Sequence, residues 1–205
     1  MEVWHQVLQQ LINGISLGSI YALIALGYTM IYGIIKLINF AHGDIYMVGA
    51  YIGFFAITQA HLSVVPALLI SLVVTGFLGM LVERLAYKPL RHAPRISVLI
   101  TAIGVSFFLE YTTMYFVSPT PRTFPAMFGD VAVTVGGIVI NGQQMLILGI
   151  TAVLMVILTY IVQKTKTGKA MRAASFDTET AELMGINSDR IISITFGIGS
   201  ALAAV

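Results

Sequence analysis

The chain has no cysteine and few charged residues. Asp, Glu, Lys and Arg together make up 10% of its 205 residues, whereas a typical soluble domain has roughly 25%. Without cysteine there are no disulfide bonds, no thiolate zinc sites and no cysteine nucleophiles. A compact soluble domain is excluded as well, because 58% of the residues are hydrophobic and one small core cannot bury that much apolar surface.

Several catalytic motifs are also missing. The chain contains no GxxxxGK[ST] sequence, so it has no P-loop with which to bind and hydrolyse ATP itself. It has no HExxH motif and no Ser/His/Asp arrangement, and His42 and Asp44 are too few ligands for a metal site. We therefore expect a protein that is not an enzyme and that has no cofactor, no metal and no nucleic-acid partner.

What the sequence has instead is a series of long apolar runs. About 20 apolar residues in a helix cross the roughly 30 Å hydrocarbon core of a membrane. The sequence predicts an all-α polytopic membrane protein, with one transmembrane domain over residues 1–205 and about six transmembrane segments. The last of these is too short to cross, so we expect the chain to stop inside a span. The expected segments are Val7–Ile35, Ile45–Ala60, Val64–Val82, Ile96–Val117, Met145–Val162 and Ile191–Val205.

The second run, Ile45–Ala60, is short for a full crossing. It follows the polar, glycine-containing stretch KLINFAHGD at 36–44, as a broken or re-entrant membrane helix would. A tight turn followed by an ordinary crossing fits equally well, and the sequence leaves both alternatives open. In the first run, Gly14 and Gly18 form a GxxxG pair, which permits close contact between helices.

Basic residues gather on one side of the predicted bundle. If the spans alternate, Lys36 and the basic residues of 83–95 and 164–190 lie on one side, and only Arg122 lies on the other. Lys and Arg are enriched in cytoplasmic loops, so the first side is predicted to be cytoplasmic and the N-terminus external. A re-entrant second run would invert the N-terminus alone.

The stretch 118–144 is predicted to be an ordered external loop. It opens with three prolines, and the strand-like segments VAVTV and IVI then flank Gly136-Gly137. Two glycines between two such segments are typical of a β-hairpin. We therefore expect a short external hairpin.

The longest hydrophilic passage, 164–190, has the pattern of two short helices. Gly168 is predicted to break the helix that leaves the membrane, and Lys169–Ser175 to form the first short helix. Asp177 suits the N-cap of a second helix, Thr178–Met184, and Gly185 suits its C′ position. The element has small faces that would fit a groove of another protein, made by Ala170, Ala173, Ala174 and Ala181.

Glu110 lies well inside the predicted fourth span. An acid within a membrane segment is a functional-site hypothesis by default, and a transport path is one role it could have. A structural or interfacial role is the alternative, because Glu110 lies within reach of the external end.

Two stretches resemble a known family. The segment GISLGSIYALIALGYTMIYGIIKLINFAHGDIYMVGAY at 14–51 resembles the signature of permease subunits in ABC importers of branched-chain amino acids, the LIV type. The segment TGKAMRAASFDTETAELMGINSDRIISITFGIGSALAA at 167–204 resembles their cytoplasmic coupling segment and the following helix. The family's members are longer, so the resemblance implies that this chain is the N-terminal two-thirds of a permease domain, truncated at its C-terminus.

The resemblance also implies partners and a location. They are a second related permease, two cytoplasmic ATPase subunits, a periplasmic solute-binding protein and the lipid of a bacterial inner membrane. The N-terminus would be periplasmic, 164–190 would be the cytoplasmic coupling loop, and 118–144 would help to meet the binding protein. The implied coupling residues are Gly168, Arg172, Ala173, Asp177, Ala181, Gly185 and Ile186. The implied translocation-path residues are Asn39, Phe40, Ala41, His42 and Gly43, to which Glu110 is added from its position alone.

The function expected from this resemblance is ATP-driven import of branched-chain amino acids. Relatives in the family import urea or short amides, which is the first alternative. An ion-coupled secondary transporter and a membrane scaffold are two further alternatives.

Overall fold

The computed structural model describes residues 2–91, 93–124, 132–135 and 138–205, and most of these are helical. Within these residues, four helical stretches are long and apolar enough to cross a membrane, by length and composition. The first is α1 (Glu2–Ile35), and the second is α3 (Val64–Val82) with its continuation through a π-helical turn and a 3₁₀ turn to Leu90. The others are α4 (Arg95–Val117) and α5 (Gly142–Lys164). The prediction of a mostly helical protein with several membrane-spanning helices is confirmed. The predicted number of about six spans stays a prediction, because only four stretches among the described residues meet this length and composition.

The remaining helices are shorter. The second predicted span forms α2 (His42–Thr58), of 17 residues, and the last forms α8 (Ser188–Ala203), of 16. The hydrophilic passage forms α6 (Lys166–Phe176) and α7 (Thr178–Leu183). The turns that continue α3 are η1 (Glu83–Tyr87) and η2 (Lys88–Leu90).

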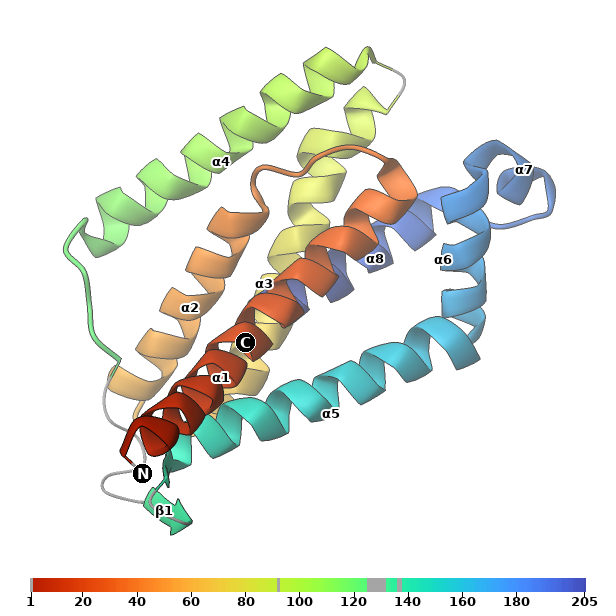
Figure 1. Cartoon of the computed structure of the whole chain (residues 1–205). Coiled ribbons are helices and arrows are strands. Elements are labelled where there is room, and N and C mark those ends of the chain that lie inside the picture. The colour runs from red at the N-terminus through yellow and green to blue at the C-terminus, as the bar shows by residue number, and fades with distance from the viewer. Residues whose placement is uncertain (1, 92, 125–131, 136–137) are drawn as a thin grey trace.

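The helices form a bundle with α3 and α8 near its centre. Helix α8 packs against both α3 and α1, and α2 packs against α3. Helices α4 and α5 lie on opposite flanks (Figure 1). Most of the surface of these two outer helices is exposed in the isolated chain, and it is apolar. A membrane or further helices must therefore cover it.

Small residues allow α8 to approach its neighbours closely. The backbone of Gly27 in α1 meets the backbone of Gly199 in α8, and Gly79 of α3 faces Ser200. Helices pack in membranes through such small residues, because lipid gives them no hydrophobic drive to associate. The GxxxG pair of Gly14 and Gly18 makes no close helix contact among the described residues, because a Cβ added at either would meet nothing within 4 Å.

The two ends of the bundle differ in chemistry. One end carries residues 36–41, η1, η2, α6 and α7, and we call it the basic end. A buried apolar cluster lies there, in which the Tyr87 and Phe196 rings pack with their centroids 5.3 Å apart. This cluster joins the ends of α1 and α3 to the first half of α8.

The opposite end, which we call the hairpin end, carries β1 (Ala132–Val135) and β2 (Ile138–Asn141) (Figure 1). The strands pair antiparallel with Val135 opposite Ile138, which confirms the predicted hairpin. The predicted turn residues Gly136 and Gly137 lie outside the described residues. The side chain of Gln9 in α1 donates to the Val139 carbonyl at 2.8 Å and accepts from the Val139 N–H at 2.9 Å, so the hairpin is fixed to α1.

Helix α2 runs from the basic end to the hairpin end. Near its C-terminus the Phe54 ring packs edge-on against Phe124, which follows α4 in the loop. The guanidinium of Arg122 lies over the Phe54 and Phe55 rings, 5.8 and 5.7 Å from their centroids. The two ends of α2 therefore lie towards opposite ends of the bundle.

Candidate functional site

The hydrophilic element α6–α7 is joined to α5 by a sharp bend at Thr165. The Thr165 hydroxyl accepts a hydrogen bond from the Gly168 N–H at 3.0 Å, so Thr165 is the N-cap of α6. The prediction that Gly168 breaks the helix and that α6 begins at Lys169 is wrong. Gly168 lies inside the first turn of α6, where a Cβ would collide with the carbonyl oxygens of Ile161 and Val162. Glycine is required there for close approach, rather than for a break.

The predicted caps around α7 are confirmed. The Asp177 carboxylate accepts from the N–H groups of Glu179 at 3.0 Å and Thr180 at 3.2 Å. The Thr180 hydroxyl also donates to it at 2.5 Å, and this bond, with those from the backbone, lowers the pKa of Asp177. Gly185 follows the helix with φ of +84°, a conformation that favours glycine.

The alanines of this element face inward, contrary to the proposed docking face. Ala174 is buried in the apolar cluster of the basic end, and Ala181 is buried as well. Ala173 is half-buried, and Ile186 packs against the same cluster. The Arg172 side chain is exposed and its guanidinium donates to the Val162 carbonyl, which ties α6 to the end of α5.

Large apolar side chains occupy the outer surface of the element instead. Phe176, Leu183 and Met184 are 85%, 87% and 79% exposed. All three lie on the hydrophilic passage 164–190. Exposed apolar patches are typical of surfaces that contact another protein or a membrane. We call these three residues the apolar tip.

The predicted path residues 39–43 lie at the basic end, and most of them are buried. The Asn39 side-chain oxygen accepts from the Tyr87 hydroxyl at 2.6 Å and from the Ala41 N–H at 3.1 Å. His42 Nε2 lies 3.2 Å from the Ile24 carbonyl, and its ring meets Tyr28 edge-on. Asn39, Ala41 and His42 are buried, whereas Phe40 and Gly43 are exposed.

Glu110 lies on the face of α4 that meets α2. One turn earlier, the Ser106 hydroxyl donates to the carboxylate of Asp44 in the first turn of α2. Residues four apart share a helix face, so Glu110 lies above this link towards the hairpin end. Its carboxylate is half-buried and has no hydrogen bond or ion pair within the described part of the chain.

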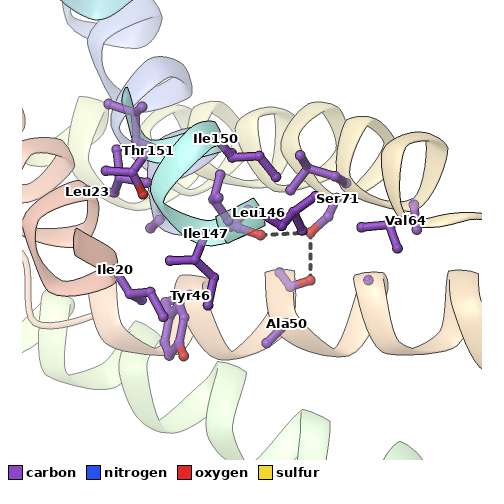
Figure 2. A pocket seen from close by; sticks show the side chains of 18 of the residues that line it. Ile20, Leu23, Tyr46, Ala50, Val64, Ser71, Leu146, Ile147, Ile150 and Thr151 are labelled. Atoms are coloured by element: carbon purple, nitrogen blue, oxygen red, sulfur yellow. Dashed lines mark hydrogen bonds between the residues drawn. The ribbon is translucent and has the colours of Figure 1, made fainter. Parts of the chain in front are cut away.

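A cavity of about 300 Å³ lies between α1, α2, α3, α5 and α8 (Figure 2). Its walls are mainly aliphatic, with Leu146, Ile147 and Ile150 of α5 facing Ile20 and Leu23 of α1. Phe124 and Gln143 also line it, which places it towards the hairpin end. Neither residues 39–43 nor Glu110 is among the residues that line it.

Hydroxyl groups are the main polar features of this cavity. Ser71 donates to the Gly49 carbonyl at 2.7 Å, and the Ala204 carbonyl lies 3.3 Å from the same oxygen (Figure 2). Tyr46 and Thr151 also line the cavity. Sequence reasoning missed these residues, because isolated hydroxyls on apolar runs carry no pattern; only the packing of five helices brings them together.

Comparisons with known proteins identify the family of the chain. The family described as the permease component of branched-chain amino acid transport systems matches residues 10–205. No solved structure shows a significant match to the chain.

Two relatives illustrate the similarity. The chain is 44% identical over 218 residues to the high-affinity branched-chain amino acid transport permease BraD of Pseudomonas aeruginosa, covering 100% of this chain and 70% of the relative. It is 40% identical over 211 residues to the corresponding permease LivH of Escherichia coli K12, covering 97% of this chain and 68% of the relative. The chain belongs to the family of permease components of branched-chain amino acid transport systems.

Proposed function

We propose that this chain imports branched-chain amino acids across a bacterial inner membrane, as the permease subunit of an ATP-driven importer. The observation that carries the proposal is the family match over residues 10–205. Relatives of 39–44% identity are named as branched-chain amino acid permeases, which favours these substrates over urea, short amides and ion-coupled transport. The partners would be a second permease, two ATPase subunits and a periplasmic binding protein.

In this proposal the six helices α1, α2, α3, α4, α5 and α8 all enter the membrane. The contacts of Phe54 and Phe55 with the loop after α4 support a full crossing by α2. The basic end faces the cytoplasm, because almost all Lys and Arg residues lie on that side. The N-terminus is then periplasmic, and the loop 118–144 faces the binding protein.

The element 164–190 is proposed as the ATPase-coupling loop, with its contact surface revised. The apolar tip of Phe176, Leu183 and Met184 enters the ATPase groove, while Gly168, Ala173, Ala181 and Ile186 hold the element against the bundle. Arg172 fixes its angle to α5, and Asp177 and Gly185 set the turn between α6 and α8. Burial of the tip on docking is supported by its exposure in the isolated chain.

We propose the aliphatic cavity as the place where the substrate side chain is received. Its volume of about 300 Å³ is at the lower end of the range for small-ligand pockets. An apolar wall with a few hydroxyls suits a leucine, isoleucine or valine side chain and offers little to urea. On the proposed path, residues 39–43 then lie beyond this cavity at the basic end, whereas Glu110 of α4 lies nearer the hairpin end and does not line the cavity.

The test uses the assembled transporter in proteoliposomes. Phe176→Ala and Leu183→Ala should each reduce co-purification of the ATPase subunits and leucine uptake. Trp4→Ala, an exposed apolar residue near the hairpin end, should leave co-purification unchanged. Ile147→Trp should lower leucine uptake while ATPase binding persists. Retention of the ATPases by the double variant Phe176→Ala/Leu183→Ala would contradict the docking surface.

The alternatives give different results in the same vesicles. Uptake of urea in preference to leucine would favour an amide importer. Leucine uptake that collapses with a proton uncoupler at constant ATP would favour an ion-coupled transporter.

A further inference from the structure

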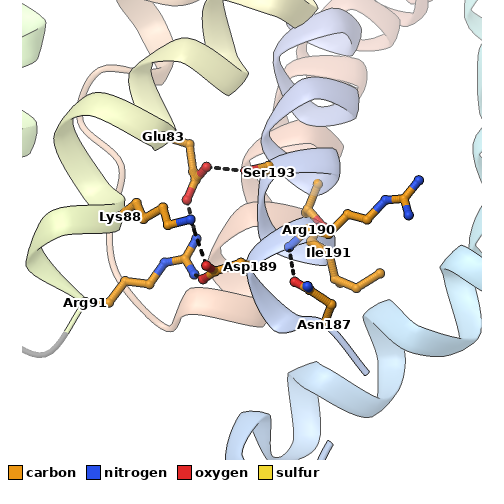
Figure 3. Close-up of polar contacts among 9 residues, drawn as sticks. Glu83, Lys88, Arg91, Asn187, Asp189, Arg190, Ile191 and Ser193 are labelled. Atoms are coloured by element: carbon orange, nitrogen blue, oxygen red, sulfur yellow. Dashed lines mark hydrogen bonds and ion pairs between the residues drawn. The ribbon is translucent and has the colours of Figure 1, made fainter. Parts of the chain in front are cut away.

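A buried carboxylate joins α3 to the start of α8 at the basic end. Glu83 is fully buried, at the point where α3 passes into η1. One carboxylate oxygen pairs with Arg91, and the other accepts a hydrogen bond from the Ser193 hydroxyl of α8 (Figure 3). The two groups that satisfy Glu83 therefore come from the α3–α4 connection and from α8.

Arg91 bridges two acidic groups. Its second terminal nitrogen pairs with Asp189, in the first turn of α8 (Figure 3). Asp189 also pairs with Lys88 of η2 at 2.8 Å. The Lys88 hydrogen bond, with the charges of Arg91 and Lys88, lowers the pKa of Asp189, so this carboxylate is charged at neutral pH.

This network lies between the proposed coupling loop and the membrane helices, so a movement of the loop can reach those helices through it. Asp189 follows Gly185 by only four residues, so the apolar tip connects to the network through a short segment. The network in turn connects to α3 through Glu83 and to the α3–α4 connection through Arg91. The adjacent contact of Tyr87 with Phe196 supports the same junction.

A gain in folding stability alone does not explain the buried ion pair of Glu83 and Arg91. Desolvation of the two charges cancels much of their attraction, and apolar residues of similar volume are often as stable. A buried pair does, however, fix the relative position of the groups that it joins. Arginine suits this arrangement because its planar guanidinium can hold two carboxylates at once, whereas lysine presents a single point charge.

We propose that Glu83, Arg91 and Asp189 form a relay that transmits displacement of α6–α7 from α8 to α3 and the α3–α4 connection. The relay rests on the proposed function of α6–α7 as the coupling loop. Its three members are positioning residues: they hold the membrane helices in register with the coupling loop and do not contact the substrate. Loss of the bridge leaves ATP hydrolysis running while α3 no longer follows α8.

The test measures leucine transported per ATP hydrolysed in proteoliposomes that contain the complete transporter. Asp189→Asn is the first variant, because Asp189 is half-exposed and its loss leaves no charge buried without a partner. Arg91→Lys is the second, because it keeps a positive charge beside Glu83 but cannot hold both carboxylates. Each variant should lower the ratio by about five-fold or more, the lower end of typical couplings between sites, with ATPase co-purification unchanged.

Two further variants separate a relay from a structural role. Arg84→Gln removes a neighbouring exposed charge of η1 that has no ion pair within the described residues, and it should leave the ratio unchanged. The double variant Glu83→Gln/Arg91→Gln leaves no buried charge, so the chain should express normally but remain uncoupled. Restoration of the full ratio by this double variant or by Arg91→Lys would show a structural role only and would overturn the relay.

Failure of the relay and failure of the proposed function give different results. If the wild-type chain does not retain the ATPase subunits, the proposed function fails and the relay fails with it. If the wild-type complex assembles and transports, but Asp189→Asn and Arg91→Lys keep the wild-type ratio, the relay alone is overturned.

Discussion

Gly27 of α1 and Gly199 of α8 lie backbone to backbone: a Cβ added at Gly199 would stand 2.7 Å from the Gly27 carbonyl oxygen. No side chain fits between the two helices at this point. Helix α8 also packs against α3, so the spacing at these two glycines sets the width of the central part of the bundle.

Replacing either glycine of this pair should destabilise the chain. Gly199→Val places an isopropyl group, a Cβ with two methyl groups, against the backbone of α1 and the side chain of Ile31. Overpacking of this kind costs about 1–3 kcal/mol. The measurement is the melting temperature of the purified chain in detergent. Gly14→Ala, where a Cβ meets nothing within 4 Å among the described residues, is the control and should melt at the wild-type temperature or slightly above it, because alanine favours a helix.

A second prediction concerns the bend between α5 and α6. Gly168→Ala puts a methyl group into the carbonyl oxygens of Ile161 and Val162, so α6 must move away from the end of α5. We expect normal insertion of the chain but loss of ATP-coupled leucine uptake, because the coupling loop is displaced. Gly149→Ala on α5, a site with open space, should retain uptake. Full activity of Gly168→Ala would contradict the close approach.

The left-handed backbone at Gly185 gives a graded prediction. At φ of +84° an L-residue costs about 1–2 kcal/mol, and asparagine tolerates this region better than most residues. Gly185→Asn should therefore keep more coupled uptake than Gly185→Val. Limited proteolysis around 184–187 should rank the variants in the same order. Equal behaviour of Asn and Val would show that the turn is not held in this conformation.

Because the chain has no cysteine, introduced cysteines can report on the central helices. A Cβ at Gly76 of α3 would lie 3.5 Å from the Ala201 Cβ of α8, within the range of about 3.5–4.5 Å seen in disulfides. The variant Gly76→Cys/Ala201→Cys should cross-link on oxidation. If α3 and α8 move together, the cross-linked transporter stays active; uptake that returns only on reduction would contradict joint motion.

At the hairpin end, Gln9→Ala removes both hydrogen bonds to Val139. We expect the strands to remain paired, since their register does not depend on Gln9, but the loop should detach from α1. Faster proteolysis of residues 118–141 at an unchanged melting temperature would verify this. Gln10→Ala, on the neighbouring position of α1, is the matched control, and equal protection of the loop in both variants would argue against the contact.

Apolar runs and caps predicted most of the fold. The long helices follow from uninterrupted apolar sequence, and Asp177 and Gly185 mark α7 because capping chemistry is local. Gly168 was misassigned because a glycine that breaks a helix and one that permits close approach look the same in sequence. Only the bend at Thr165, which brings α6 back on α5, distinguishes them.

The relay and the cavity were beyond sequence reasoning for a different reason. Glu83 was grouped with a basic loop, and nothing local shows that its partners Arg91 and Ser193 come from separate elements. The alanines of α6 and α7 were assigned outward because small residues suit both a partner's groove and the chain's own core. The structure distinguishes the two uses because it shows that Ala174 and Ala181 are buried. Their burial depends on where α8 packs.

Helix α5 begins at the hairpin end, where it is attached to α1. It can therefore act as a lever that pivots about this end. Gln144 at its start donates to Asn13 of α1 at 2.8 Å, whereas its far half packs against α6, α1 and, through Leu158 and Leu202, the end of α8. At 1.5 Å per residue this helix is roughly 34 Å long, so a tilt of about 10° about the hairpin end would carry Lys164 through about 6 Å. A small rotation that scarcely moves the hairpin end would thus displace the basic end of α5 by several ångströms.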